Sequence, residues 1–334
     1  MFGHDKIEIL HLPTPLEHLK NISEDTGVNF YIKRDDLTNL ATGGNKLRKL
    51  EYFLKDALDK GASMLITEGG AQTNHGRLTA AVAAKYGLKA AIVTADKYPG
   101  MISANLLLDG MLGCPVYFVN DVEKDIPGII ARYEEQGERV YRIPMGGSNE
   151  MGILGYAECG VEVDKQAKDL GIGDAYVVST IGSMGTYMGI LAGLKSIKSD
   201  LKLLGISIFP YPEGLKNSLA EYGLKIKKFF GLDFNFEDDD FFVRTEYDFG
   251  DYNNPVKEVR EAVYYMARKE AIILDPCYTG KTFAGLLDII RKGDIPQGSN
   301  VIFMHTGGLP GIYTEHHRVE FEKELMPVMH IENE

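Results

Sequence analysis

The sequence predicts an α/β fold built on parallel β-sheet. Short apolar runs of strand length alternate with longer segments whose apolar residues recur at helical spacing. This alternation indicates βαβ units with right-handed crossovers. Loops rich in glycine and hydroxyl residues follow several predicted strands, where open α/β sheets bind their ligands. At 334 residues, 44% of them apolar, the chain is long enough for two modest domains with buried cores.

The first half of the chain opens with an extended arm at residues 12–16, whose two prolines lack the donors of a central strand. Short apolar runs then predict strands at 29–33, 62–67, 88–94, 115–119 and 139–143. Helical spacing predicts a helix that begins at 47 and is stopped by Gly61, and further helices at 74–86, 101–112 and 126–136.

The second half continues the alternation with a long helix that begins near Gly152. Strands are predicted at 174–179, 203–208 and 301–305, and helices at 186–197, 256–266 and 281–290. Residues 225–252 interrupt the pattern, because phenylalanines there flank an acidic run at 237–240. This segment could be an active-site lid, a dimer contact or an inserted hairpin.

Composition narrows the class of protein. A net charge of −12 argues against a nucleic-acid partner. The chain has no continuous apolar stretch of membrane-spanning length and no signal-peptide pattern, and the spacing of Cys114, Cys159 and Cys277 fits neither a zinc motif nor a disulfide framework. We therefore expect a cytoplasmic protein without a metal, a membrane or a nucleic-acid partner.

Lys46 is the first candidate functional residue. It follows Gly43, Gly44 and Asn45 and lies where a flexible loop gives way to a helix. A lysine at a helix start can be merely solvated, but one held by the backbone can form a Schiff base with an aldehyde. Upstream, Arg34 and Asp35 either pair with each other and fix the loop or are solvated turn charges.

Three loops each lead from a predicted strand into a predicted helix. Residues 68–75 present backbone N–H groups that suit a substrate carboxylate, with Asn74 placed to hydrogen-bond a ring oxygen. Residues 179–186 combine two glycines with hydroxyls and form a phosphate cradle without the Walker or dinucleotide pattern. Residues 274–281 place Tyr278 and Thr279 at the end of an apolar run. Each loop also has an ordinary structural explanation, as a capped turn or a core tyrosine, but together with Lys46 they indicate pyridoxal phosphate.

An ordered set of motifs then resembles the family of 1-aminocyclopropane-1-carboxylate (ACC) deaminases and D-cysteine desulfhydrases. The set spans almost the whole chain: Pro-Thr-Pro-Leu at 13–16, Lys-Arg-Asp-Asp at 33–36, Gly-Gly-Asn-Lys at 43–46, Gln-Thr-Asn-His at 72–75, Gly-Gly-Ser-Asn at 146–149, the glycine loop at 182–186, Leu-Asp-Pro-x-Tyr at 274–278 and His-Thr-Gly-Gly at 305–308. This family is a branch of the fold-type II pyridoxal-phosphate enzymes, related to tryptophan synthase β.

The resemblance implies a fold and an assembly. The fold has two open, mostly parallel sheets flanked by helices. A large cofactor-binding domain is formed by residues 1–47 with 157–334, a small domain by 48–156, and the cofactor lies in the cleft between them. It also implies a homodimer.

The resemblance also implies site residues. Lys46 looks like the Schiff-base lysine, Asn74 like the partner of the cofactor ring hydroxyl, and Tyr278 and Tyr252 like active-site tyrosines. The implied phosphate loop is Gly182, Ser183, Met184, Gly185 and Thr186, and the implied substrate-carboxylate site is Thr73, Asn74 and His75. Thr73 stands where the family usually has serine, so a tight fit at its methyl group is in question.

Two positions separate the chemistries within the family. ACC deaminases resemble one another in a glutamate after the tyrosine and a leucine after the histidine of the last loop, whereas this chain has Thr279 and Thr306, as the desulfhydrases do. A carboxylate keeps the cofactor's pyridine nitrogen protonated and strengthens the electron sink, which threonine cannot do by charge. We therefore expect β-elimination, with D-cysteine as substrate.

Other activities stay open at this point. ACC deaminase is the main alternative, and D-serine, 3-chloro-D-alanine and cysteate are further candidate substrates. The sequence does not decide whether His75 or Arg77 would bind a sulfonate. A protein that binds pyridoxal phosphate without turnover is the non-enzymatic alternative.

Overall fold

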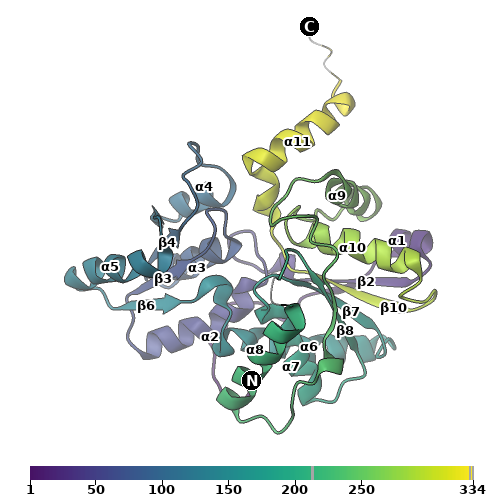
Figure 1. The fold of residues 1–334 in the computed structure, drawn as a ribbon, viewed down its shortest axis with the longest axis horizontal. Coiled ribbons are helices and arrows are strands. Elements are labelled where there is room, and N and C mark those ends of the chain that lie inside the picture. The colour runs from purple at the N-terminus through teal and green to yellow at the C-terminus, as the bar shows by residue number, and fades with distance from the viewer. Residues whose placement is uncertain (212–213, 331, 333–334) are drawn as a thin grey trace.

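The computed structural model describes residues 1–211, 214–330 and 332, and their strands form two sheets (Figure 1). The six-stranded sheet has the order β1 (Leu16–His18), β2 (Asn29–Arg34), β10 (Asn300–His305), β7 (Tyr176–Ile181), β8 (Lys202–Ser207) and β9 (Phe242–Arg244). The four-stranded sheet has the order β5 (Val116–Phe118), β4 (Lys89–Thr94), β3 (Met64–Glu68) and β6 (Val140–Ile143). All neighbours are parallel except β1 and β2. The predicted fold class is therefore confirmed.

Helices cover both faces of the six-stranded sheet because alternate strand residues point to opposite sides. Val177 and Ile302 face one apolar core, which includes residues of α6 (Glu150–Asp169), α7 (Gly185–Ser196) and α8 (Leu215–Phe230). Val178 and Phe303 face the other core, which includes residues of α9 (Lys257–Glu270), α10 (Thr279–Lys292) and the short α1 (Lys20–Thr26).

The four-stranded sheet is enclosed in the same way. One face packs on α2 (Lys46–Asp59) and α3 (Asn74–Lys85), and the other packs on α5 (Val122–Glu135). Next to α3 lies α4 (Ala104–Met111). Every strand of the four-stranded sheet lies within residues 48–156, and every strand of the six-stranded sheet lies outside that range. The division of the chain into two domains at these bounds stays a prediction.

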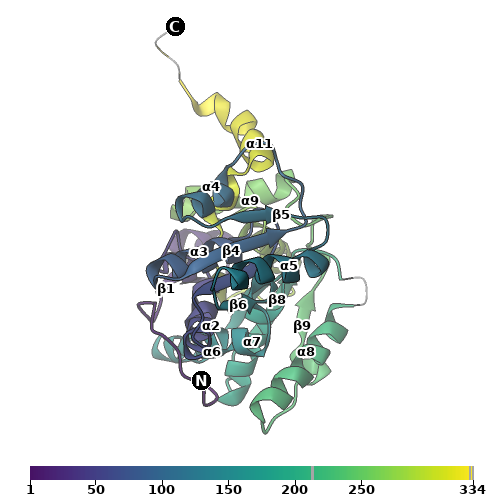
Figure 2. The ribbon, with the colours of Figure 1, turned by 90° about the vertical axis from the view of Figure 1, so that its left-hand side faces the viewer.

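Several elements are not in the sequence prediction: β1, α1, α8, β9 and α11 (Glu315–Leu325), which projects from the rest of the fold in both views (Figure 1, Figure 2). Short 3-10 turns lie at Asp35–Leu37, Met145–Gly147, Asp238–Asp240, Leu309–Tyr313 and Met326–Val328. The unusual segment 225–252 completes α8 and then adds β9 in parallel to β8, so the hairpin interpretation is wrong.

Pairing between Arg34 and Asp35 is also corrected. Arg34 forms ion pairs with Asp36 and Glu17, whereas Asp35 is fully buried against the Arg48 guanidinium. Arg48 lies two residues beyond Lys46 on α2, so the ion pair that fixes the start of this helix is the Asp35–Arg48 pair. Among the residues that the structure describes, none of the helices combines the length and apolar character needed to cross a bilayer.

Candidate active site

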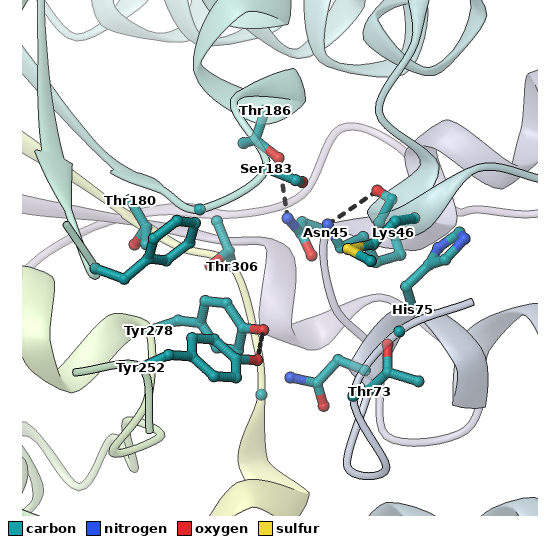
Figure 3. Close-up of a pocket in the computed structure, with 18 of the residues that line it drawn as sticks. Asn45, Lys46, Thr73, His75, Thr180, Ser183, Thr186, Tyr252, Tyr278 and Thr306 are labelled. Carbon is teal, nitrogen blue, oxygen red and sulfur yellow. Dashed lines mark hydrogen bonds between the residues drawn. The ribbon is translucent and has the colours of Figure 1, made fainter. Parts of the chain in front are cut away.

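A cavity of about 450 Å³ lies where strands of both sheets end, a volume typical of small-ligand sites (Figure 3). The loops that follow β3, β6, β7, β8 and β10 all contribute to its wall. The structure brings the following predicted residues into this wall: Lys46, Thr73, Asn74, His75, Gly182, Ser183, Met184, Thr186, Tyr252, Tyr278 and Thr306. Gly185 and Thr279 are not among the lining residues.

Lys46 begins α2 at the edge of the cavity. Gly43 and Gly44 adopt φ of 68° and 125°, and a Cβ at Gly44 would lie 3.2 Å from the carbonyl oxygen of Thr306, so glycine lets the two loops meet. The Lys46 Nζ donates to the carbonyl of Gly146 at 3.1 Å. Burial lowers the pKa of Lys46 to about 8, so near neutral pH far more of the amine is unprotonated and nucleophilic than in a solvated lysine.

A second lysine, Lys49, lies one turn further along α2 and is completely buried. Its Nζ donates to the Gly146 carbonyl at 3.2 Å, the same acceptor that Lys46 uses, and to Ser148 Oγ at 3.2 Å. Burial and the neighbouring Lys46 hold the pKa of Lys49 well below its usual range. A Cβ at Gly185 would lie 2.9 Å from the Lys49 Nζ, so this glycine makes room for the second amine.

The start of α7 forms the upper wall of the cavity in Figure 3. Ser183 and Thr186 lie there, and the Asn45 Nδ2 donates to Thr186 Oγ1 at 3.0 Å. The first N–H groups of a helix have no partner within the helix and attract anions. This end of α7 is suited to a phosphate group.

At the start of α3, hydrogen bonds fix the orientation of the Asn74 side-chain amide. Asn74 Oδ1 accepts from Arg77 Nη1 at 2.9 Å and from Asn105 Nδ2 at 3.0 Å. Because a guanidinium can only donate, the carbonyl end of the Asn74 amide must face Arg77, and its NH₂ end is left for a ligand. Thr73 caps the helix, with its Oγ1 accepting from the backbone N–H of Gly76.

His75 follows on α3, close to the two lysines. Its side chain is buried and neither ring nitrogen has a hydrogen-bond partner. Burial, with Lys46 and Lys49 nearby, holds the pKa of His75 well below its usual range, so the ring is neutral. Unpartnered buried nitrogens beside a cavity indicate a place where a ligand or water completes the site.

Arg77 does not line the cavity. Its guanidinium is fully buried and donates to Asn74, Asn105 and the carbonyl of Gly43. Of the two residues considered for an additional anionic substrate group, only His75 therefore lines the cavity, and it carries no charge.

Two tyrosines form the wall opposite Lys46 (Figure 3). The hydroxyls of Tyr252 and Tyr278 hydrogen-bond to each other, and the ring centroids are 5.7 Å apart at an interplanar angle of 74°. Burial raises the pKa of both hydroxyls, so both stay protonated at neutral pH.

The two discriminating threonines occupy different surroundings. Thr306 lines the cavity. Thr279 is completely buried, and its Oγ1 donates to Asp275 Oδ1 at 2.7 Å and accepts from the backbone N–H of Asp275 at 2.9 Å. One acceptor lone pair of the hydroxyl is left, so contact of Thr279 with a cofactor stays a prediction.

Sequence reasoning missed several members of this wall, and Lys49 next to it: Asn45, Met145, Phe209, Pro210 and Asp251 line the cavity. Phe209 and Pro210 directly follow β8, so the rule that ligands lie beyond carboxyl strand ends could have identified them. Lys49 carried no such signal, because a lysine three residues after another on a helix is normally solvated.

The donor set fits pyridoxal phosphate. Lys46 offers an amine for its aldehyde, the start of α7 suits its phosphate, and the Asn74 NH₂ suits its ring oxygen. A Cβ at Gly146 would lie 2.7 Å from Ser183 Oγ and 3.4 Å from the Lys46 Nζ, so the glycine keeps the space between them open.

Known proteins agree with this assignment. The sequence profile of the family described as "Pyridoxal-phosphate dependent enzyme" matches residues 7–307. A putative ACC deaminase of Pyrococcus abyssi is 36% identical over 313 residues, which cover 92% of this chain and 93% of that protein. D-cysteine desulfhydrase of Salmonella newport is 36% identical over 328 residues, which cover 94% of this chain and 97% of that protein.

Solved structures show the same relationship. The crystal structure of an ACC deaminase homologue matches with a TM-score of 0.85 and 34% identity, and covers 98% of this chain and 97% of its own. Threonine deaminase isoform 2 of Solanum lycopersicum, at 18% identity and a TM-score of 0.66, shares the fold and covers 96% of this chain and 85% of its own. The chain belongs to the pyridoxal-phosphate dependent enzymes, in the family of ACC deaminases and D-cysteine desulfhydrases.

Proposed function

We propose that this enzyme catalyses β-elimination on a small amino acid, with D-cysteine converted to pyruvate, hydrogen sulfide and ammonia. The observation that carries the proposal is the placement of a base and two weak acids on opposite sides of one cavity. Lys46, with its pKa near 8, is suited to removing the Cα proton. Pyridoxal phosphate, when bound, supplies the electron sink that stabilises charge at Cα.

The tyrosines favour a thiol as the leaving group. The proton goes to Lys46, the electron pair of the Cα–H bond forms the Cα–Cβ double bond, and the sulfur departs from Cβ with the electrons of the C–S bond. Because the raised pKa of Tyr252 and Tyr278 makes them poor acids, they suit a group that leaves readily as an anion. Addition of water to the unsaturated product then gives pyruvate and ammonia.

Two of the alternative substrates, D-serine and cysteate, suit this site less well than D-cysteine. A thiolate leaves more easily than hydroxide, which disfavours D-serine. Cysteate would bring a sulfonate into the cavity, but Arg77 does not line the cavity and His75 is neutral. The substrate carboxylate fits the start of α3, where Thr73 and the backbone N–H groups lie.

ACC deaminase is the second candidate, favoured by the Pyrococcus relative and by the solved homologue. Against it stand Thr279 and Thr306, since opening a cyclopropane calls for the stronger sink that a carboxylate would provide at position 279. The homodimer and the cytoplasmic location stay predictions.

The test offers the purified, cofactor-loaded enzyme D-cysteine, L-cysteine, D-cysteate and ACC in parallel, with Lys46→Ala as the control variant. Pyruvate, 2-oxobutyrate, sulfide and sulfite are measured. Sulfide with pyruvate from D-cysteine is the expected result. 2-Oxobutyrate from ACC would refute the role given to the two threonines, and bound cofactor without turnover of any of the four would favour the non-enzymatic alternative.

A further inference from the structure

Lys281 has a buried side chain that none of the predicted roles uses. It lies on α10, three residues after Tyr278, and has no exposed surface. Its Nζ donates to the backbone carbonyls of Ile208 at 3.0 Å and Asp248 at 2.6 Å, and to that of Asp251. A protonated amine has three N–H donors, so three carbonyl acceptors match the ammonium form.

The three carbonyls come from segments that also build the cavity wall. Ile208 is followed by Phe209 and Pro210, and Asp251 is followed by Tyr252. The helix that carries Lys281 carries Tyr278 at its start. One ammonium group therefore links the end of β8, the segment 248–252 and the start of α10, and each of these contributes lining residues.

The segment 248–253 depends on such support. It lies between β9 and α9 without regular secondary structure, and Phe249, Gly250 and Asn253 all have positive φ, at 56°, 89° and 61°. Asparagine adopts positive φ readily, but a phenylalanine does so only where the surroundings hold it there. Lys281 contacts the segment at two carbonyls, on either side of the residues with φ of 56° and 89°.

We propose that Lys281 is a positioning residue whose ammonium acts as a tethered monovalent cation, holding residues 248–252 so that the Tyr252 hydroxyl meets that of Tyr278 on one wall of the cavity. Carbonyl oxygens that converge on one cation are the ligands that replace the hydration shell of K⁺. A free ammonium or potassium ion should therefore substitute for the side chain once it is removed. The proposal rests on the role of the two tyrosines in the proposed reaction, but not on the identity of the substrate.

The experiment compares Lys281→Ala, which opens space for an ion, with Lys281→Met, which fills that space without charge. Both are studied in a tetramethylammonium buffer, with and without added ammonium, potassium or lithium. Lys292→Met, at the exposed end of the same helix, controls for loss of charge on α10. Hydrogen exchange of residues 245–256 and kcat/KM are measured.

Lys281→Ala is expected to exchange faster in this segment and to lose about 10²-fold in kcat/KM, the cost of a small misplacement of a catalytic group. Ammonium and potassium should slow the exchange and restore roughly tenfold of kcat/KM, whereas lithium should do neither. Lys281→Met should show the same losses with no response to any ion. If Lys281→Ala folds only when ammonium is present, that also supports the proposal.

The proposal would be overturned if Lys281→Met had the hydrogen exchange and kcat/KM of the wild type. It would also be overturned if ammonium changed neither quantity in a folded Lys281→Ala, or if it changed them in Lys281→Met. The exchange measurement needs no substrate. It therefore tests the positioning role of Lys281 even if the enzyme turns over none of the four amino acids, so the proposed function and the role of Lys281 can fail independently.

Discussion

Replacing Asp35 by asparagine tests the buried ion pair that anchors the helix bearing Lys46. The Asp35 carboxylate has no exposed surface. It accepts hydrogen bonds from Arg48 Nε at 2.8 Å, Arg48 Nη2 at 2.9 Å, Thr14 Oγ1 at 2.8 Å and Tyr156 Oη at 2.6 Å. Asparagine has the same shape but turns an NH₂ group toward these donors and leaves Arg48 without the Asp35 charge.

The structure sets the size of the effect. Burial alone would raise the pKa of Asp35, but the Arg48 guanidinium overrides it and lowers that pKa from 3.8 to about 2. At about 1.4 kcal/mol per pH unit, this difference corresponds to about 2.5 kcal/mol of stability at neutral pH. Removal of one partner of a buried pair costs about 3–5 kcal/mol. We expect Asp35→Asn to lower the free energy of unfolding by about 3 kcal/mol at pH 7.

The pH dependence has a definite sign. Because the folded pKa lies below the unfolded value, the contribution is fully present above pH 3.8 and is lost as the pH falls through about 2. The ionisation contribution of about 2.5 kcal/mol should therefore fall by about half at pH 3, and the difference between wild type and variant should narrow with it.

Urea unfolding at several pH values measures this difference. Asp169→Asn, at an exposed pair with Lys165, is the matched control and should change the free energy of unfolding by less than about 0.5 kcal/mol. A loss below about 1 kcal/mol for Asp35→Asn, or a difference from wild type that is the same at pH 3 as at pH 7, would refute the reasoning.

Three further predictions concern the cofactor. Lys46→Ala should remove the visible absorbance of bound pyridoxal phosphate while the circular dichroism of the fold stays unchanged, and a retained band would exclude this lysine. The rate at which wild-type protein freed of cofactor recaptures pyridoxal phosphate should rise as the pH approaches about 8, the pKa of Lys46, and then level off, whereas a midpoint above pH 10 would contradict the lowered pKa. Arg77→Met should release the Asn74 amide and weaken cofactor affinity about tenfold, or about 1.4 kcal/mol, in equilibrium dialysis, and unchanged affinity would show that Arg77 does not fix this donor.

The parallel strands and the loops after them could be predicted because their signals are local. Strands buried on both faces appear as short apolar runs, as β7 and β10 do. By contrast, β1 and β9 have three residues each and lie at sheet edges, so neither carries a measurable alternation. The buried residues of α11 are His317 and Phe321 alone, which gives no apolar stripe for a periodicity to detect.

The candidate site was predicted where residue type and motif coincided, as at Lys46 and in the loop at 182–186. It was missed where burial comes from distant segments. Lys49 is buried because the segments at Gly147 and Gly185 lie against it. Lys281 is buried by carbonyls 30 to 73 residues away in the chain. Spacing along a sequence cannot show that such lysines lack a solvent-exposed face.

The same distant packing explains why Lys46 has a low pKa. Carboxylates close to α2 are already paired elsewhere: Asp35 with Arg48, Glu162 with Arg48 and Lys33, and Glu51 with Lys6. The pKa of the Lys46 amine is set by its burial and by its neighbour Lys49, and no acidic side chain contributes to it. An unpaired carboxylate there would hold the proton on Lys46 and remove the nucleophile. The carboxylates near the start of α2 are therefore neutralised by Arg48 and Lys33, and the helix is anchored by ion pairs without an acidic side chain acting on the reactive amine.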